Sequence, residues 1–393
     1  MVLLKYLFPL LFISFALSET LKIRVYQSVA VGLFDFVIFT IVVVWFFTTR
    51  KEKYEIKKPI AIFSSIGIIS LVINFTNFNI EQIFISLLYL IRWILYACIY
   101  FVIVDTSKSY KNNLMRYMFL SGVLVIVLGF IQFFFYPNLK NLYYLGFDEH
   151  MHRLFSTFLD PNYAGTFFVL FFVFIFVLRD KLFGNKKSLS YLVLVINFIA
   201  IVLTFSRGAI LMFIVCVVIY SALTRKWKLT AGVICLFALI FFVLSPIFYI
   251  ENTNLLRFAS TEARIDSSKR ALEIFQKNPM GVGFNTYRFA REKYEKTEWT
   301  GFGPSHSGAG VDNSFVLILV TTGLLGLMSY VYLLYKLFKL GFAGLKKNKI
   351  SLVLIISLGG LAVNALFINS LLYSFIMIWI WILAGLTESK KRG

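Results

Sequence analysis

Apolar runs long enough to cross a lipid bilayer recur along the whole chain, and this pattern limits the possible folds more than any other feature. Of the 393 residues, 59% are hydrophobic and 18% are aromatic. About 20 consecutive apolar residues are enough for a helix to span the hydrocarbon core. The sequence therefore predicts an all-α polytopic membrane protein.

The runs predict about 12 transmembrane helices. We place these spans at residues 3–18, 27–48, 59–76, 82–104, 115–136, 164–179, 188–205, 208–224, 229–249, 314–335, 350–368 and 371–387.

Basic residues are distributed unevenly between the loops. If the spans alternate strictly, 24 Lys and Arg residues fall on the side that holds both termini. The short loops of the other side hold five: Lys22, Arg24, Lys140, Arg153 and Arg207. Cytoplasmic loops of membrane proteins are enriched in basic residues, so both termini are predicted to be cytoplasmic and the multi-pass protein to lie in the cytoplasmic (inner) membrane. The net charge of +20 is thus explained by topology, and we predict no nucleic-acid partner because the charges form no single basic face.

The predicted organisation has three parts. Residues 1–249 hold helices 1 to 9 with an external loop at 137–163, residues 250–313 form a helical extracytoplasmic loop domain, and residues 314–393 hold helices 10 to 12 and a cytoplasmic tail. The first span contains "LLFISFALS", which is also compatible with a signal peptide, although removing it would not change the orientation of the rest.

Three arginines on the predicted outer side occupy positions suited to an anion. Arg207 lies in "TFSRGA", a hairpin too short to need a charge, and Gly208 follows it. Arg153 precedes "LDPN", where Asp160 and Asn162 can cap the next span. Arg264 lies in a predicted helix at 262–277, beside a face formed by Ile265, Ser268, Leu272 and Phe275. Arg270 is about 240° away on that helix and cannot face the same ligand as Arg264. Each arginine could also be a simple anchor at the membrane edge.

Two other patterns suggest different functions. The sequence "DEHMHR", which includes His150 and His152, could bind a divalent metal, although a polar loop is the better explanation. Asp35 and Arg92 lie inside spans, where charges mark transport pathways or form a structural pair. On those two residues a lipid-linked sugar transporter or flippase remains an alternative.

Four blocks in order resemble the O-antigen ligase and polymerase family: "RLFSTFLDPNYAG", "TFSRGA", "R…NPMGVGFNTY" and "DNSFVLILVTTGLLGL". The resemblance covers roughly residues 150 to 335. It implies a GT-C-like glycosyltransferase that acts outside the cytoplasmic membrane on sugars linked to undecaprenyl diphosphate, with no metal or cofactor. Repeat-unit polymerase is the first expectation and ligation to a lipid or protein acceptor is the alternative. A flippase and chain-length regulators would be its protein partners, and membrane lipid would surround it.

The resemblance also implies roles for individual residues. Arg207 and Arg264 would hold the diphosphate. Family ligases carry a histidine before the Asn of this block, whereas this chain has Asp312. Either Asp312 is the base, or His306 takes that role, or Asp312 caps the following helix. Further substrate-binding positions are Arg153, Asp160, Asn162, Asn313, Tyr287, Arg288 and Arg270.

Overall fold

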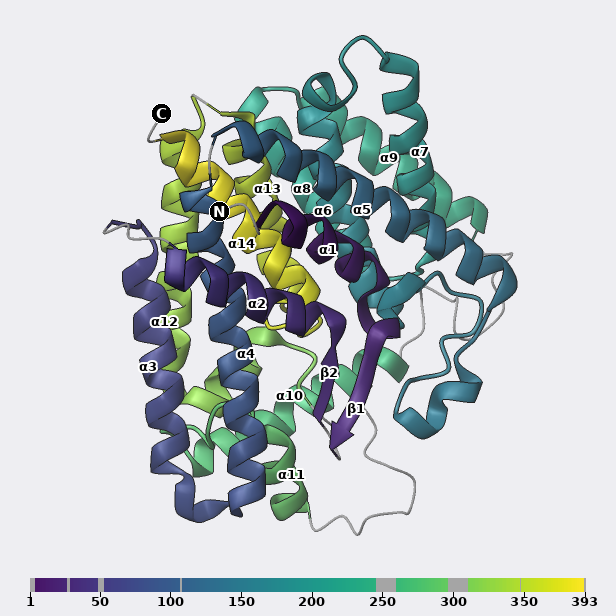
Figure 1. Ribbon diagram of the computed structural model, residues 1–393. Helices are drawn as coiled ribbons and strands as arrows, with labels where there is room; N and C mark the ends of the chain where they lie inside the picture. Colours follow the sequence, from purple (N-terminus) through teal and green to yellow (C-terminus); the bar gives the residue numbers. More distant parts are fainter. Residues whose placement is uncertain are drawn as a thin grey trace.

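The computed structural model describes residues 4–26, 29–48, 53–106, 108–244, 259–295, 310–346 and 348–391. In these ranges every predicted span overlaps one helix, which confirms the all-α polytopic fold (Figure 1). The helices are α1 (Leu4–Leu17), α2 (Leu33–Thr48), α3 (Lys57–Ile73), α4 (Ile80–Asp105), α5 (Lys108–Phe135), α6 (Pro161–Phe183), α7 (Lys187–Leu203), α8 (Arg207–Thr224), α9 (Trp227–Leu244), α12 (Ser314–Gly344), α13 (Lys349–Asn364) and α14 (Ser374–Lys391).

Six of the described helices are long and apolar enough to cross a membrane by length and composition. These six are α1 with the turn that follows it, α4, α5, α6, α8 and α12. Five shorter apolar helices, α2, α7, α9, α13 and α14, accompany them. The protein is therefore a multi-pass membrane protein.

Aromatic side chains fill the core of the bundle. The fully buried indole of Trp379 on α14 contacts the rings of Phe167, Phe171 and Phe174 on α6, at centroid distances of 5.2 to 6.2 Å. Phe15 of α1 lies 6.1 Å from the same indole and is 2% exposed. The first predicted span thus packs inside the bundle as one of its core helices.

The predicted span at 27–48 is too long at its start. Residues Lys22–Tyr26 form strand β1 and Val29–Gly32 form strand β2, an antiparallel hairpin, and α2 begins only at Leu33. Alternating branched residues such as Ile23, Val29 and Val31 favour strands, although their apolar character alone resembles that of a membrane span. The hairpin lies at the bottom of Figure 1, on the face where α6, α8 and α12 begin. We call this face the lower face.

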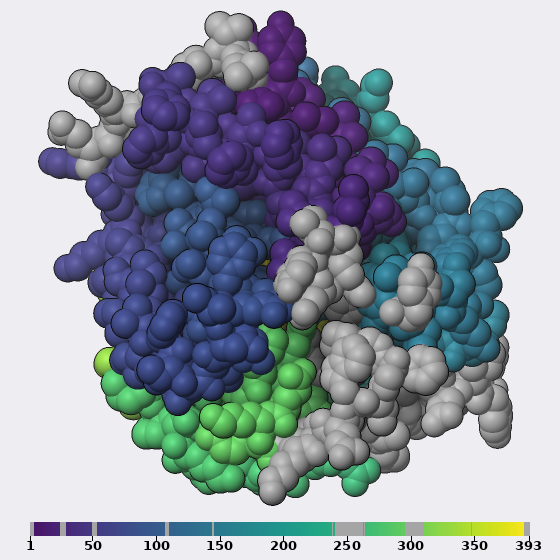
Figure 2. Space-filling model, turned by 60° about the horizontal axis from the view of Figure 1, so that its bottom comes forward, coloured from purple at the N-terminus to yellow at the C-terminus, as the bar shows by residue number. Residues whose placement is uncertain are grey.

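Helices α10 (Ala259–Lys277) and α11 (Tyr287–Glu295) also lie at the lower face, beneath α12 and beside the α3–α4 connection (Figure 2). They pack through a second hydrophobic cluster separate from the main core, made of Ala271, Ile274, Val282, Tyr287, Ala290, Val311, Leu317 and Val320. The predicted packing face of α10 was therefore only partly right. Ile265 and Leu272 are 50% and 39% exposed, whereas Ala271 and Ile274 are buried.

A backbone-to-backbone contact joins α10 to α12. Residues 279–284, which follow α10, lie against residues 320–323 of α12, and we call this contact the glycine clip. The amide nitrogens of Val282 and Gly283 donate to the carbonyls of Val320 and Thr321 at 2.9 and 2.8 Å. Gly323, with a φ of 70°, interrupts the helical dihedrals of α12 at this point.

Only glycine fits at the centre of the clip. A Cβ atom on Gly281 would lie 2.5 Å from the Gly323 nitrogen, and one on Gly323 would lie 2.7 Å from the Met280 carbonyl oxygen. Both residues have positive φ angles, which side chains disfavour. The clip explains the "GVGF" stretch, which is too short for a phosphate-binding loop, as a packing element.

Candidate active site

Three of the helices that begin at the lower face, α6, α8 and α12, have side-chain caps. Asp160 Oδ1 accepts from the amides of Asn162 (2.6 Å) and Tyr163 (3.3 Å) at the start of α6, as the sequence predicted. Ser206 caps α8 in the same way. The Ser206 hydroxyl also donates to Asn162 Oδ1 at 3.0 Å, which ties the two helix starts together. Free amides and the helix dipole give such starts a partial positive charge.

The cap of α12 is Asn313 and not Asp312. Asn313 Oδ1 accepts from the amides of Phe315 and Val316 at 2.9 and 3.1 Å, while its Nδ2 donates to the Leu366 carbonyl at 3.2 Å. The capping alternative for Asp312 is therefore wrong, because the next residue already fills that position. The Asp312 carboxylate is left facing the lower face with an exposed surface.

Arg207 and Arg264, which the resemblance pairs on a diphosphate, lie within electrostatic range of each other. Arg207 is the first residue of α8 and Arg264 lies on α10, seven residues before the buried Ala271 and thus on the same side of the helix. Both side chains are half-buried, and they lie close enough for their charges to repel each other. Among the described residues, the Arg264 guanidinium has no hydrogen bond or ion pair. Its donors are therefore available to a ligand.

Asp312 lies within electrostatic range of Arg264 and of Asp160. Loss of water raises the pKa of Asp312, the charge of Asp160 raises it further, and the positive charge of Arg264 opposes the rise. Desolvation likewise raises the pKa of Asp148, together with the charges of Asp160 and Asp312. Within the described chain, Asp312 makes no hydrogen bond. It is an available proton acceptor with an increased proton affinity.

Tyr163 is a member of this cluster that the sequence analysis missed. Its hydroxyl lies within electrostatic range of Asp160, Asp312, Glu19 and Arg264. Its ring stacks on Tyr373, with the centroids 3.8 Å apart and an interplanar angle of 11°. The residue stands inside the quoted "LDPNYAG" block, one position after Asn162, and that position was the signal that could have revealed it.

Two other expected binding residues are structural. Arg153 is 2% exposed, and its Nε donates to the Thr204 carbonyl at 2.9 Å, so it holds the turn before Arg207 instead of facing a ligand. Tyr287 is 2% exposed and lies in the second hydrophobic cluster. A buried arginine on backbone carbonyls and a buried tyrosine have positioning roles.

The remaining predicted residues are dispersed. Gly208 allows α8 to approach α13, because a Cβ there would lie 3.4 Å from Asn364 Nδ2. The small residue at this position thus serves helix packing, and not the close approach of a ligand. Arg270 is exposed on another side of α10 from Arg264, as its spacing predicted, and Arg288 is half-buried on α11. His306 lies outside the described residues.

The "DEHMHR" segment lies next to the cluster. His150 Nε2 is 4.0 Å from Asp160 Oδ2. In the described ranges, no group of three or more His, Cys, Asp or Glu side chains is arranged to hold a metal ion. The histidine is thus placed as a neighbour of the α6 cap.

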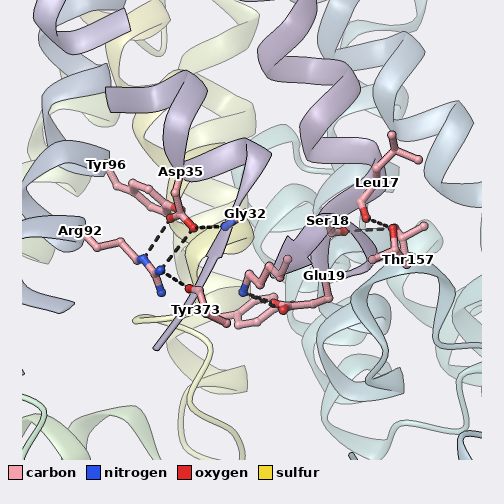
Figure 3. A network of polar contacts seen from close by, with 12 residues as sticks. Leu17, Ser18, Glu19, Gly32, Asp35, Arg92, Tyr96, Thr157 and Tyr373 are labelled. Carbon is pink, nitrogen blue, oxygen red and sulfur yellow. Dashed lines mark hydrogen bonds and ion pairs between the residues drawn. The ribbon is translucent and has the colours of Figure 1, made fainter. Parts of the chain in front are cut away.

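The intramembrane charges form a separate cluster, shown in Figure 3. Arg92 Nε lies 3.0 Å from Asp35 Oδ1, and the Arg92 guanidinium also donates to the Ala30 carbonyl at 2.6 Å. The Tyr96 hydroxyl and the Gly32 amide donate to the same carboxylate at 2.6 and 2.9 Å. Asp35 and Arg92 therefore form an ion pair, as the structural-pair interpretation expects.

Residues 192–331 match the family model described as O-antigen ligase. The match contains three of the four blocks that carried the resemblance, together with Arg207, Arg264 and Asp312. It confirms the resemblance to the O-antigen ligase and polymerase family over these residues. No curated protein shows significant similarity to the chain.

Proposed function

Starting from the O-antigen ligase match over residues 192–331, we propose that the protein polymerises the repeat units of a surface polysaccharide, such as O-antigen or capsule. The donor is a growing glycan on undecaprenyl diphosphate, and the acceptor is a sugar hydroxyl of another lipid-linked repeat unit. One observation carries the proposal: a guanidinium and a carboxylate with no hydrogen bonds to described residues, Arg264 and Asp312, lie together beside Arg207.

The arginines fit the leaving group. A diphosphate leaves with its negative charge, and a guanidinium can hold two of its oxygens at once. Two arginines that repel each other gain a shared counter-ion when a diphosphate binds between them. The positive starts of α6 and α8, which Asn162 and Ser206 tie together, add to the attraction.

Asp312 fits the base. The acceptor oxygen forms a bond to the anomeric carbon, the bond from that carbon to the diphosphate oxygen breaks with its electron pair, and the acceptor proton passes to Asp312. A carboxylate with a raised pKa is a stronger base, so the environment of Asp312 suits this step. No metal is needed, because the arginines neutralise the departing charge.

The lower face is proposed to be the outer side of the inner membrane. The uneven distribution of basic residues supports this orientation, because the loops at the other face hold most of the short-loop Lys and Arg residues. Both termini are then cytoplasmic, and residues 250–313 form the external loop domain.

The family description itself favours a second candidate, a ligase that transfers the finished glycan to a lipid or protein acceptor. Asp312 in place of histidine is the feature that favours the polymerase. The transporter alternative loses its support, because Asp35 and Arg92 satisfy each other.

The test is reconstitution of the purified protein with lipid-linked oligosaccharide extracted from cells in which its gene has been deleted. We expect a ladder of products that increase by one repeat unit, and we expect it to persist in EDTA. Arg207→Ala should abolish the ladder. Consumption of donor without a ladder, and only after another acceptor is added, would identify the ligase. Restoration of an EDTA-treated sample by a divalent ion would contradict the metal-free mechanism.

A further inference from the structure

The hydroxyl of Tyr163 is a polar group of the site that the reaction above does not use. It lies within electrostatic range of Asp160, Asp312, Glu19 and Arg264. In the part of the chain that the structure describes, it neither donates nor accepts a hydrogen bond. A tyrosine hydroxyl can do both, so this one has its full capacity for a ligand.

The ring that carries this hydroxyl is held firmly. Tyr163 is in the first turn of α6, where its amide donates to the capping Asp160. Tyr373 stacks on the ring, and the Tyr373 hydroxyl donates to Glu19 Oε1 at 3.1 Å (Figure 3). Glu19 is in turn paired with Lys22 at 2.7 Å. Stacking and this chain of contacts place the Tyr163 hydroxyl before any ligand arrives.

Charges of both signs lie near the hydroxyl. Arg264, which lies near Arg207, brings positive charge suited to the donor diphosphate. Glu19, which the Tyr373 hydroxyl contacts, and Asp160 bring carboxylates, and Lys22 and Arg92 offset part of the Glu19 charge. An uncharged sugar offers hydroxyls that donate to carboxylates and accept from a phenol.

We propose that Tyr163 is an acceptor-binding residue that holds an uncharged sugar near Glu19 and directs its attacking hydroxyl to Asp312. The proposal rests on the proposed function and names the acceptor class of that reaction. Tyr163 donates to the acceptor sugar and transfers no proton. Tyr373 and Glu19 are positioning residues that fix the Tyr163 ring.

The test compares Tyr163→Phe, which keeps the ring, with Tyr143→Phe, a matched control on an exposed residue of the same face. Donor-side binding is measured with undecaprenyl diphosphate alone. Transfer is measured with lipid-linked oligosaccharide from cells lacking the gene. Release of free glycan to water, which needs no sugar acceptor, is measured in the same reactions.

We expect Tyr163→Phe to lower transfer about threefold to tenfold, the value of one hydrogen bond, through a higher KM for the lipid-linked repeat unit. The Kd for undecaprenyl diphosphate and the rate of glycan release should stay within twofold of the wild type. Tyr143→Phe should change none of these quantities. Unchanged transfer, or a loss of undecaprenyl diphosphate binding, would overturn the acceptor assignment.

Two further results separate this proposal from the proposed function. Arg264→Ala should weaken undecaprenyl diphosphate binding, and if it does not, the donor site is wrong whatever Tyr163 does. If Tyr163→Phe fails to fold, Tyr373→Phe takes its place because it keeps the stacked ring but loses the bond to Glu19. It should raise the KM for the repeat unit with an unchanged Kd for undecaprenyl diphosphate, and an unchanged KM contradicts the proposal.

Discussion

Two charged clusters of this protein look alike in sequence and differ in structure. In the closed cluster of Asp35, Arg92 and Tyr96, the carboxylate accepts from a guanidinium, a phenol and the Gly32 amide. In the open cluster of Arg264, Asp312 and Tyr163, none of the three side chains has a hydrogen bond to a described residue. Both clusters combine an arginine, an aspartate and a tyrosine. From this difference we infer that hydrogen-bond saturation, and not residue type, separates a structural pair from a candidate ligand site.

The largest expected effect tests the base of the open cluster. Asp312→Asn removes the proton acceptor and should lower turnover about 10²–10⁴-fold. Because Asn313 caps α12, the substitution should leave the melting temperature of the purified protein unchanged. Turnover is measured with the lipid-linked repeat unit. As the contrast, Asn313→Ala should lower stability by about 0.5–2 kcal/mol. Near-normal turnover of Asp312→Asn would mean that another residue is the general base. His306 would then be the first residue to mutate.

The next effect concerns the open arginine. Arg264→Ala should lower turnover about 10²–10³-fold, the usual cost of one donor to a developing oxyanion. Arg264→Lys should recover little, because a single ammonium cannot reproduce the two parallel donors of the guanidinium. Lys269→Ala, an exposed cation one turn and a half along the same helix, is the control and should be neutral. If Arg264→Ala and Lys269→Ala lowered turnover equally, the net charge of α10 would matter and not the guanidinium of Arg264.

A substitution in the closed cluster should lower the stability of the protein and leave its turnover unchanged. Asp35→Asn leaves Arg92 without its anion, and we expect a loss of about 1–3 kcal/mol because the pair is only partly exposed. Turnover per folded molecule should remain normal. Thermal unfolding in detergent measures the first quantity, and the repeat-unit assay measures the second. If Asp35→Asn were stable but inactive, the two clusters could not be distinguished in this way, and Asp35 would count as a functional residue.

The smallest effect is a shift in pH dependence. The negative charge of Asp160 raises the pKa of Asp312, so Asp160→Asn should lower that pKa while the new amide still caps α6. The base works only when it is deprotonated. The acid limb of the pH–rate profile should therefore move to lower pH. Asp180→Asn, which affects a carboxylate paired with Lys349, is the control. A limb that moves to higher pH would contradict the assignment of Asp312 as the titrating base.

The helices could be predicted from the sequence because apolar length is a strong signal. All the predicted spans coincide with helices, and the spacing of Arg264 and Arg270 correctly separated the two on α10. The hairpin at 22–32 was missed because its branched apolar residues also suit a membrane helix.

The site was predicted less completely, because sequence shows residue types without their partners. Arg153 lies before the start of α6 and Arg207 is the first residue of α8, yet one is buried on the Thr204 carbonyl and the other lies near Arg264. Asp312 and Asn313 are adjacent good caps, and only the geometry of α12 decides between them. Tyr163 was missed because its position in the "LDPNYAG" block was the one sequence signal, and a tyrosine in an aromatic-rich chain does not stand out until its stacking and charged neighbours are known.

The glycine clip limits how this protein can be engineered. Gly281 and Gly323 contact each other through main-chain atoms, so a side chain added to either one collides with the other segment. Residues 259–295 therefore cannot be exchanged for the equivalent piece of another protein while α12 is kept, unless both pieces carry the matching glycines. A chimera designed to change sugar preference should transplant 259–295 and 310–346 as one block.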